Sequence, residues 1–180
     1  MDETGWLWAL AALAVFWSVG AYNRLVRLRA ACLVALAALD ARWQQQIGLI
    51  EAALAALESQ AAAVPDSIAL REAAQELSGQ WDTLRARPLA GANQAGLASL
   101  VRSRSRVVKL WARLADPARD ALAPWPAAVQ QHWQQGLSEC DLLARQFNAA
   151  VLAYNQALAQ FPALLIARAF GFRPSEALPT

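Results

Sequence analysis

The sequence has few of the side chains from which catalytic and metal sites are built. Its 180 residues include one histidine, His132, and two cysteines, Cys32 and Cys140. They show no zinc-ligand spacing, and His132 lies among the glutamines of 130–135, which is typical of a solvated surface. A phosphate-binding loop is also missing, because the glycine-containing segment 91–96 has no preceding strand and no Lys-Ser/Thr pair. We therefore expect no enzymatic activity, no metal and no cofactor.

Net charge and strand patterning are weak as well. The formal net charge is +2, which is too small to indicate nucleic acid as a partner. No stretch shows sustained alternation of apolar and polar residues, whereas Ala and Leu dominate and the few glycines and prolines cluster between periodic stretches. The composition therefore predicts an all-α protein. In a cytoplasmic body Cys32 and Cys140 are expected to be small core residues rather than a disulfide.

One long segment, Thr4–Asn23, has no charged residue. A helix rises about 1.5 Å per residue, so this segment is long enough to cross a hydrocarbon core about 30 Å thick. Asp2 and Glu3 precede it, and three arginines follow it at 24, 27 and 29. Because basic residues stay on the cytoplasmic side of a first helix, we expect residues 1–23 to be a single-pass membrane anchor with its N-terminus outside.

Two other interpretations of this segment remain open. A cleaved signal peptide would have a basic start and an Ala-x-Ala-like site, whereas this start is acidic and Val19-Gly20-Ala21 is a poor site. An Ala-rich core helix of a soluble protein can also be this apolar. We favour the anchor, and a mature protein that starts near Ala21 would contradict it.

The rest of the chain is expected to form one helical body, residues 24–172, and a short tail, residues 173–180. The first helix has no breaker before Pro65 and is expected to run to about Ala62. Beyond the anchor its larger residues form a heptad-like seam, which suits an antiparallel four-helix-type bundle. The seam consists of Leu25, Cys32, Leu36, Leu39, Trp43, Ile47, Ile50, Leu54 and Leu57.

Four further helices follow from periodicity and from helix-breaking residues. They are expected from Asp66 or Ser67 to just before Pro88, over about 93–115, over about 127–160, and as a short helix over 164–170. Phe161-Pro162 is expected to break or kink the fourth helix, and Gly171 suits the C-cap of the fifth. Ile68, Leu77 and Leu142 are among the larger apolar residues through which these helices run.

The third of these helices has the most regular amphipathic pattern. Its apolar residues share one face, and the opposite face carries four basic residues: Arg102, Arg106, Lys109 and Arg113. One interpretation is a solvated face that offsets the acidic residues of the second helix. The other is contact with anionic lipid headgroups or with an acidic partner.

Arg104 breaks the apolar face of the same helix, between Leu100 and Trp111. A buried guanidinium is costly unless it is paired. Asp40 lies beside Leu39 and Trp43 of the first helix, so we expect it to be the partner of Arg104. The alternative is that this part of the face is an interface rather than core.

Two sets of motifs resemble the LemA family. Tyr22-Asn23-Arg24-Leu25-Val26-Arg27-Leu28-Arg29 is similar to that family's Tyr-Asn-x-Leu-Val-x-Leu-Arg signature. Near the other end, Phe147-Asn148, Val151, Tyr154-Asn155, Phe161-Pro162 and Gly171-Phe172 follow the family's order and spacing. Leu39-Asp40 also fits, whereas Gln44-Gln45-Gln46 replaces a basic cluster. The chain therefore resembles a divergent member.

The resemblance implies a bacterial inner-membrane protein with a cytoplasmic all-α bundle and no established enzymatic activity. Some members are associated with organising internal membranes. The matching residues, including some expected to form helix-helix hydrogen bonds near the bilayer, are Tyr22, Asn23, Arg29, Asp40, Tyr154, Asn155, Phe161 and Pro162.

We therefore expect a membrane-anchored structural or interaction module, with the membrane, anionic lipid, a protein of unknown identity or a second copy as partners. The alternative is an adaptor or regulator of another membrane complex, such as a protease or a transporter. A small hydrolase or metal protein is a third class, for which the sequence offers no set of residues.

Overall fold

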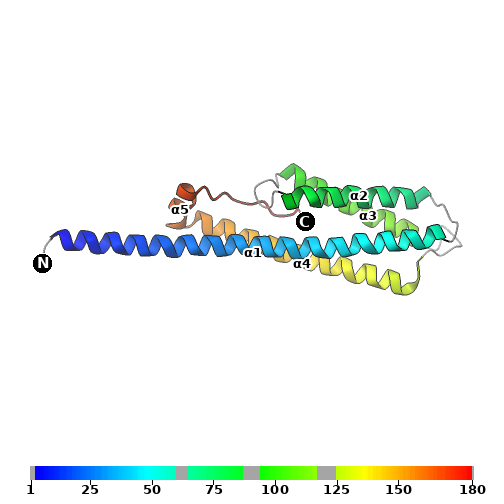
Figure 1. Ribbon diagram of the computed structural model, residues 1–180, viewed down its shortest axis with the longest axis horizontal. Helices are drawn as coiled ribbons and strands as arrows, with labels where there is room; N and C mark the ends of the chain where they lie inside the picture. Colours follow the sequence, from blue (N-terminus) through cyan, green and yellow to red (C-terminus); the bar gives the residue numbers. More distant parts are fainter. Residues whose placement is uncertain (1–2, 60–64, 87–93, 117–124, 180) are drawn as a thin grey trace.

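The computed structural model describes residues 3–59, 65–86, 94–116 and 125–179, and in these residues the fold is all-α (Figure 1). Its five helices are α1 (Glu3–Ser59), α2 (Pro65–Ala86), α3 (Gln94–Leu114), α4 (Ala127–Ala159) and α5 (Ala163–Phe170). The described chain contains no strand. The fold class and the order of helices predicted from periodicity are confirmed.

The first helix is a single rod of 57 residues whose N-terminal third extends beyond the bundle (Figure 1). The predicted seam is confirmed along its whole length, because every member from Leu25 to Leu57 is buried. Leu25 is the first buried residue of α1, so the bundle begins close to the point where the uncharged segment ends.

The bundle is built from two antiparallel pairs, α1 with α4 and α2 with α3 (Figure 1). Two ion pairs show that α2 runs antiparallel to α1. Arg71 pairs with Glu58 (2.7 Å), and Arg85 pairs with Asp40 (3.1 Å). By contrast, within the described helices no Cα atom of α3 comes within 8 Å of a Cα atom of α4. One side of the four-helix arrangement is therefore open.

At the far end of the bundle, side chains rather than backbones join α3 to α4. Trp111 stacks between Trp133 of α4 (4.5 Å between ring centroids) and Trp125, which precedes α4 (4.8 Å). All three indoles are buried. Stacked aromatic rings contribute stability beyond that of their buried area. Because the stack joins α3 to α4, it closes this end of the bundle.

At Gly136, α4 lies directly against a side chain of α1. A Cβ atom there would overlap the side-chain amide of Gln46, which is fully buried. Gly136 thus lets α4 approach α1 where a long polar side chain enters the core. Gln46 belongs to the glutamine segment that departs from the LemA pattern, and its burial was not predicted.

Two of the larger apolar residues of α2 and α4 lie outside the core. Ile68 and Leu142 are exposed, whereas Ala73, Ala74 and Leu110 are buried. The small alanines of α2 lie on the face that packs against the neighbouring helices. The size of a side chain alone does not predict that these residues are buried.

The cysteine prediction is confirmed, because Cys32 and Cys140 are free and buried. Burial raises the pKa of the Cys140 thiol to about 11, so it is neutral at physiological pH.

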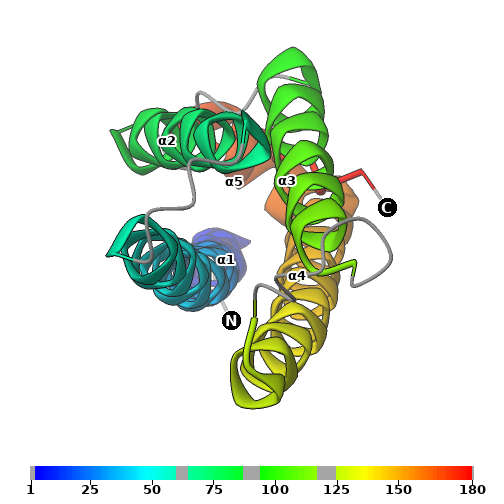
Figure 2. The same ribbon diagram turned by 90° about the vertical axis from the view of Figure 1, so that its right-hand side faces the viewer.

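The break predicted at Phe161-Pro162 is a sharp corner. The axis of α5 is turned by 97° from that of α4, so α5 lies across the end of the bundle beside α1 (Figures 1 and 2). Gly171 ends α5 with a positive φ of 71°, which glycine adopts without a steric penalty, and its N–H donates to the Ala167 carbonyl.

Candidate functional site

The apolar end, which we define as residues 5–24 of α1, residues 160–162 and α5, gathers apolar side chains that the fold leaves exposed. The N-terminal segment of α1 is apolar enough to be a membrane span or a signal sequence. None of the residues in its most apolar stretch is buried in the fold. Trp6, Trp8 and Phe16 stand free of any bundle helix. The uncharged segment is therefore not a core helix, which removes one of the three sequence interpretations.

Aromatic contacts fasten α5 to the inner end of this apolar segment. Trp17 meets Phe161 edge to face (5.5 Å between ring centroids), and Tyr22 lies against Phe170 (5.1 Å) and Phe172 (5.8 Å). The predicted motif residues Tyr22 and Phe161 are thus brought to one site. It is the corner between α1, α4 and α5.

The outer surface of α5 and of the preceding turn is apolar and open. Phe161 is 72% exposed, Leu165 55% and Phe170 65%. The inner face, by contrast, buries only the small residues Ala163 and Ala167. Arg168 lies on the same helix, and Arg24 donates to the Gln160 side chain (3.1 Å) beside it. Exposed rings next to arginines are the composition expected at a membrane interface.

The other two motif residues of α4 hold the C-terminal segment. Asn155 Nδ2 donates to the Ser175 carbonyl (2.7 Å), the Ser175 N–H donates back to Asn155 Oδ1 (3.0 Å), and the Tyr154 hydroxyl donates to the Arg173 carbonyl (3.1 Å). Burial raises the pKa of Tyr154, an effect that the positive charge of Arg29 partly offsets. The hydrogen bonds expected between helices near the bilayer are instead bonds from α4 to this segment.

Asn148 repeats the arrangement two turns earlier. It donates to the Leu178 carbonyl (3.0 Å) and accepts from the Leu178 N–H (2.8 Å). Seven helical residues span about 10.5 Å and three extended residues about 10 Å, so the two asparagines match Ser175 and Leu178 in spacing. Phe147-Asn148 belongs to the family-like pattern, which indicated that Asn148 has a role, but Leu178 was not predicted as its partner. The expected tail is therefore part of the folded body as far as Pro179.

The predicted basic face is exposed at all four positions, Arg102, Arg106, Lys109 and Arg113. Only Arg106 has an ion pair among the described residues, with Glu76 of α2 (3.2 Å). The interpretation that this face offsets the acidic residues of the second helix holds for that one pair. The other three cations have no ion pair among the described residues, and Lys109 also borders the cleft between α3 and α4 that is described below.

The predicted pairing of Arg104 with Asp40 is wrong. Arg104 pairs with Asp141 of α4, and Asp40 pairs with Arg85 of α2. The reason is position: Asp40 lies at the level where α2 ends, whereas Asp141 lies directly across the open side from α3. Arg104 also lies over the Trp43 ring (5.5 Å to the centroid), so it is only partly buried and well partnered.

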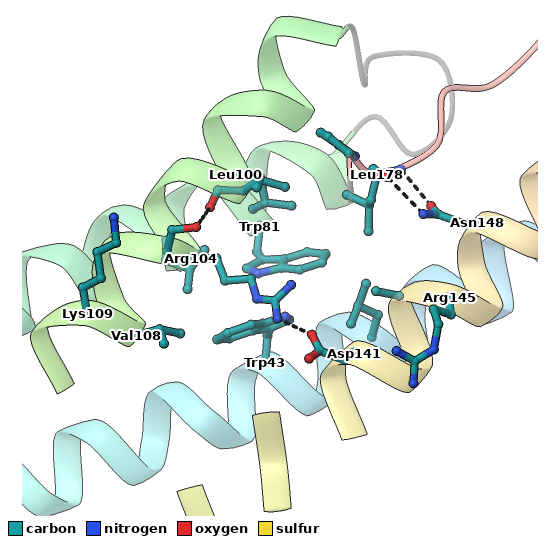
Figure 3. A pocket seen from close by; sticks show the side chains of 16 residues that line it. Trp43, Trp81, Leu100, Arg104, Val108, Lys109, Asp141, Arg145, Asn148 and Leu178 are labelled. Atoms are coloured by element: carbon teal, nitrogen blue, oxygen red, sulfur yellow. Dashed lines mark hydrogen bonds and ion pairs between the residues drawn. The ribbon is translucent and has the colours of Figure 1, made fainter. Parts of the chain in front are cut away.

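Between α3 and α4 lies a cleft of about 570 Å³, lined by residues of α1 to α4 and of the C-terminal segment (Figure 3). The Arg104–Asp141 pair crosses it, and Leu178, held by Asn148, lies at one side. Among the described residues, no group of three or more His, Cys, Asp or Glu side chains has an arrangement that could hold a metal ion.

Comparison of the chain with family models, with curated proteins and with solved structures gave no match.

Proposed function

We propose that this protein is a single-pass membrane protein whose helical bundle acts, without catalysis, as a structural and interaction module. We further propose that it is a divergent LemA-like protein of the bacterial inner membrane. The observation that carries the first proposal is the exposed apolar end of α1, which continues as one rigid helix into the buried seam. A bilayer is the surrounding in which Trp6, Trp8 and Phe16 lose their contact with water.

The position of α5 supports a second contact with the bilayer. Because α5 is turned by 97° from α4, it lies along the membrane surface when the bundle stands upright on α1. Phe161, which precedes α5, contacts Trp17, and Phe170 of α5 contacts Tyr22, so α5 lies where the apolar segment of α1 ends. Phe161, Leu165 and Phe170 then face the interface rather than water.

The arginines support the orientation with the bundle in the cytoplasm. Arg24 and Arg27 follow the apolar segment directly, and Arg168 and Arg173 lie on or after α5. Basic residues within reach of one membrane surface favour the cytoplasmic leaflet, where anionic lipids attract them by about 1 kcal/mol each.

The basic face fits a protein partner better than lipid. Asp40, which pairs with Arg85 at the end of α2, lies about 26 Å along α1 from Asn23. Arg106 is farther still, because its partner Glu76 precedes Arg85 on a helix that runs toward the membrane. Screening reduces electrostatic attraction beyond about 8 Å at physiological salt, so an upright bundle holds this face away from headgroups. An acidic protein surface is the proposed partner, which is the adaptor alternative.

The anchor is tested on the full-length protein expressed with a C-terminal green fluorescent protein. We expect the protein to resist carbonate extraction, to retain residues 1–22 by intact mass, and to fluoresce, since the fusion folds in the cytoplasm. A mature mass that begins near Ala21 contradicts the anchor. A retained anchor without fluorescence contradicts the orientation alone.

The α5 contact is tested with two exposed leucines that serve as a matched pair. Leu165 of α5 is 55% exposed and Leu142 of α4 is 49% exposed. Spin labels on Leu165→Cys and Leu142→Cys are compared in lipid nanodiscs by their accessibility to oxygen and to a water-soluble nickel reagent. We expect Leu165 to lie at the lipid interface and Leu142 in water. Equal aqueous accessibility would show that α5 does not touch the bilayer.

The adaptor alternative is tested by charge removal. Arg102→Gln, Lys109→Gln and Arg113→Gln together remove the cations of this face that have no ion pair among the described residues, and Arg24→Gln with Arg27→Gln is the membrane-side control. We expect the first variant to keep its binding to anionic nanodiscs and to lose crosslinks to a discrete protein in intact cells. Loss of nanodisc binding instead would assign the basic face to lipid.

A further inference from the structure

One side of the bundle, between α3 and α4, is open, and the contacts among the other helices do not explain why. Four-helix bundles close by packing each helix against two neighbours, yet here the backbones of α3 and α4 stay apart. The space between them is a cleft of about 570 Å³, which lies within the range of about 300–1,000 Å³ typical of small-molecule sites.

The cleft combines an apolar floor with a cationic edge. Trp43 and Trp81 form part of the floor, whereas Arg104, Lys109 and Arg145 lie on its α3 and α4 sides (Figure 3). Asp141 is the one carboxylate among its lining residues, and it is already paired with Arg104. The lining therefore carries net positive charge, which favours a ligand with an anionic head.

A buried donor points to the same chemistry. Trp81 is 1% exposed and lines the cleft, and its indole N–H has no hydrogen-bond acceptor among the described residues. A buried donor without a partner costs about 1–3 kcal/mol. An oxygen of a ligand beside Arg104 would accept from this N–H and from the guanidinium together.

We propose that this cleft binds a small anionic amphiphile, namely an apolar ring or chain that carries one carboxylate. The carboxylate lies at Arg104, since a guanidinium presents parallel donors that match a planar carboxylate. The apolar part lies on Trp43 and Trp81, toward Leu178. The C-terminal segment, which Asn148 holds, is then one wall of the site.

The probe is benzophenone-4-carboxylate, which is anionic, aromatic and photoreactive, and its neutral counterpart is benzophenone-4-carboxamide. Both are applied to the full-length protein in zwitterionic nanodiscs, and the adducts are mapped by mass spectrometry. We expect saturable carboxylate adducts on α3, α4 and the C-terminal segment, with octanoate as a competitor. The amide should label these segments at least about tenfold less, because it lacks the charge-assisted hydrogen bonds.

Two variants sharpen the result. Ala144→Phe fills the cleft and should abolish the adducts, whereas Ala149→Phe on the exposed face of the same helix should not. Trp81→Phe keeps an aromatic floor and removes the indole N–H. The variant should therefore show a smaller difference in adduct yield between the carboxylate and the amide. Melting curves show that each variant folds.

The proposal is overturned if the acid and the amide label the cleft equally in the wild-type protein, which no folding defect can explain. It is also overturned if the adducts fall only on the anchor and α5, or if they persist in a folded Ala144→Phe variant. These outcomes leave the membrane anchor untouched, because the cleft does not include residues 5–24 or α5.

Discussion

The two ends of this molecule use the same aromatic residues in opposite ways. At the far end, Trp111, Trp125 and Trp133 stack on one another and are at most 5% exposed. At the apolar end, Trp8 is 77% exposed and Phe161 72%. The first set closes a core, whereas the described residues leave the second set uncovered. Aromatic side chains therefore stabilise the fold at one end, and at the other they are available for the membrane contact proposed above.

The largest expected effect comes from the far end. Trp133→Ala should lower the free energy of unfolding by about 3–5 kcal/mol, because it removes a buried ring and leaves a cavity. Trp17→Ala, at the apolar end, should lower the free energy of unfolding far less, since Trp17 is half exposed. Chemical unfolding followed by circular dichroism in mild detergent measures both. Equal losses would break the comparison between the two ends.

The next effect concerns the close contact of α1 and α4. Gly136→Ala should lower the free energy of unfolding by about 1–3 kcal/mol, because the new methyl group overlaps the buried Gln46 amide. Gly48→Ala is the control, since nothing lies within 4 Å of a Cβ atom there. That change should stabilise the exposed helix by up to about 1 kcal/mol. Opposite signs in thermal melts are expected, and a neutral Gly136→Ala would show that the helices separate easily.

A smaller effect is expected where α4 holds the C-terminal segment. Asn155→Ala removes both bonds to Ser175 and should cost about 1–2 kcal/mol. Asn155→Asp keeps the acceptor for the Ser175 N–H and should cost less. Hydrogen exchange at the Ser175 amide measures the release of the segment. Unchanged exchange in Asn155→Ala would mean that other contacts hold it.

The smallest effect is a pH dependence inside the body. The pKa of Cys140 is about 11 in the fold against 9.0 for an ordinary thiol, so the unfolded chain loses its proton first. Stability from this group is full below about pH 9 and is lost as the pH rises toward 11. The wild-type protein should therefore lose more stability than Cys140→Ala between pH 8 and pH 10.5. Parallel curves for the two proteins would contradict the raised pKa.

The helices and the α1 seam could be predicted because they depend on local rules. Leu25 to Leu57 repeat with helical spacing, and Pro65, Pro162 and Gly171 mark boundaries that the structure keeps. The exposed apolar segment also follows from its lack of charge. These features need no knowledge of which helix lies beside which.

The candidate sites depend on neighbours and were harder to predict. Arg104 was expected to need a carboxylate, and the prediction of Asp40 failed because the true partner, Asp141, depends on the relative heights of four helices. Asn148 and Asn155 carried a family-like pattern, but their partners lie in a segment that has no periodicity of its own.

The helices, their ends, the buried seam and the uncharged apolar segment follow from the order of residues, because propensity, periodicity and charge act within a few residues. Three arrangements follow only from the folded chain: α5 turns against Tyr22, α3 and α4 stay apart, and the cleft between them is lined by both Arg104 and Trp81. Those arrangements arise from packing between residues distant in the chain, because the volume and charge of one side chain determine where a neighbouring side chain can lie.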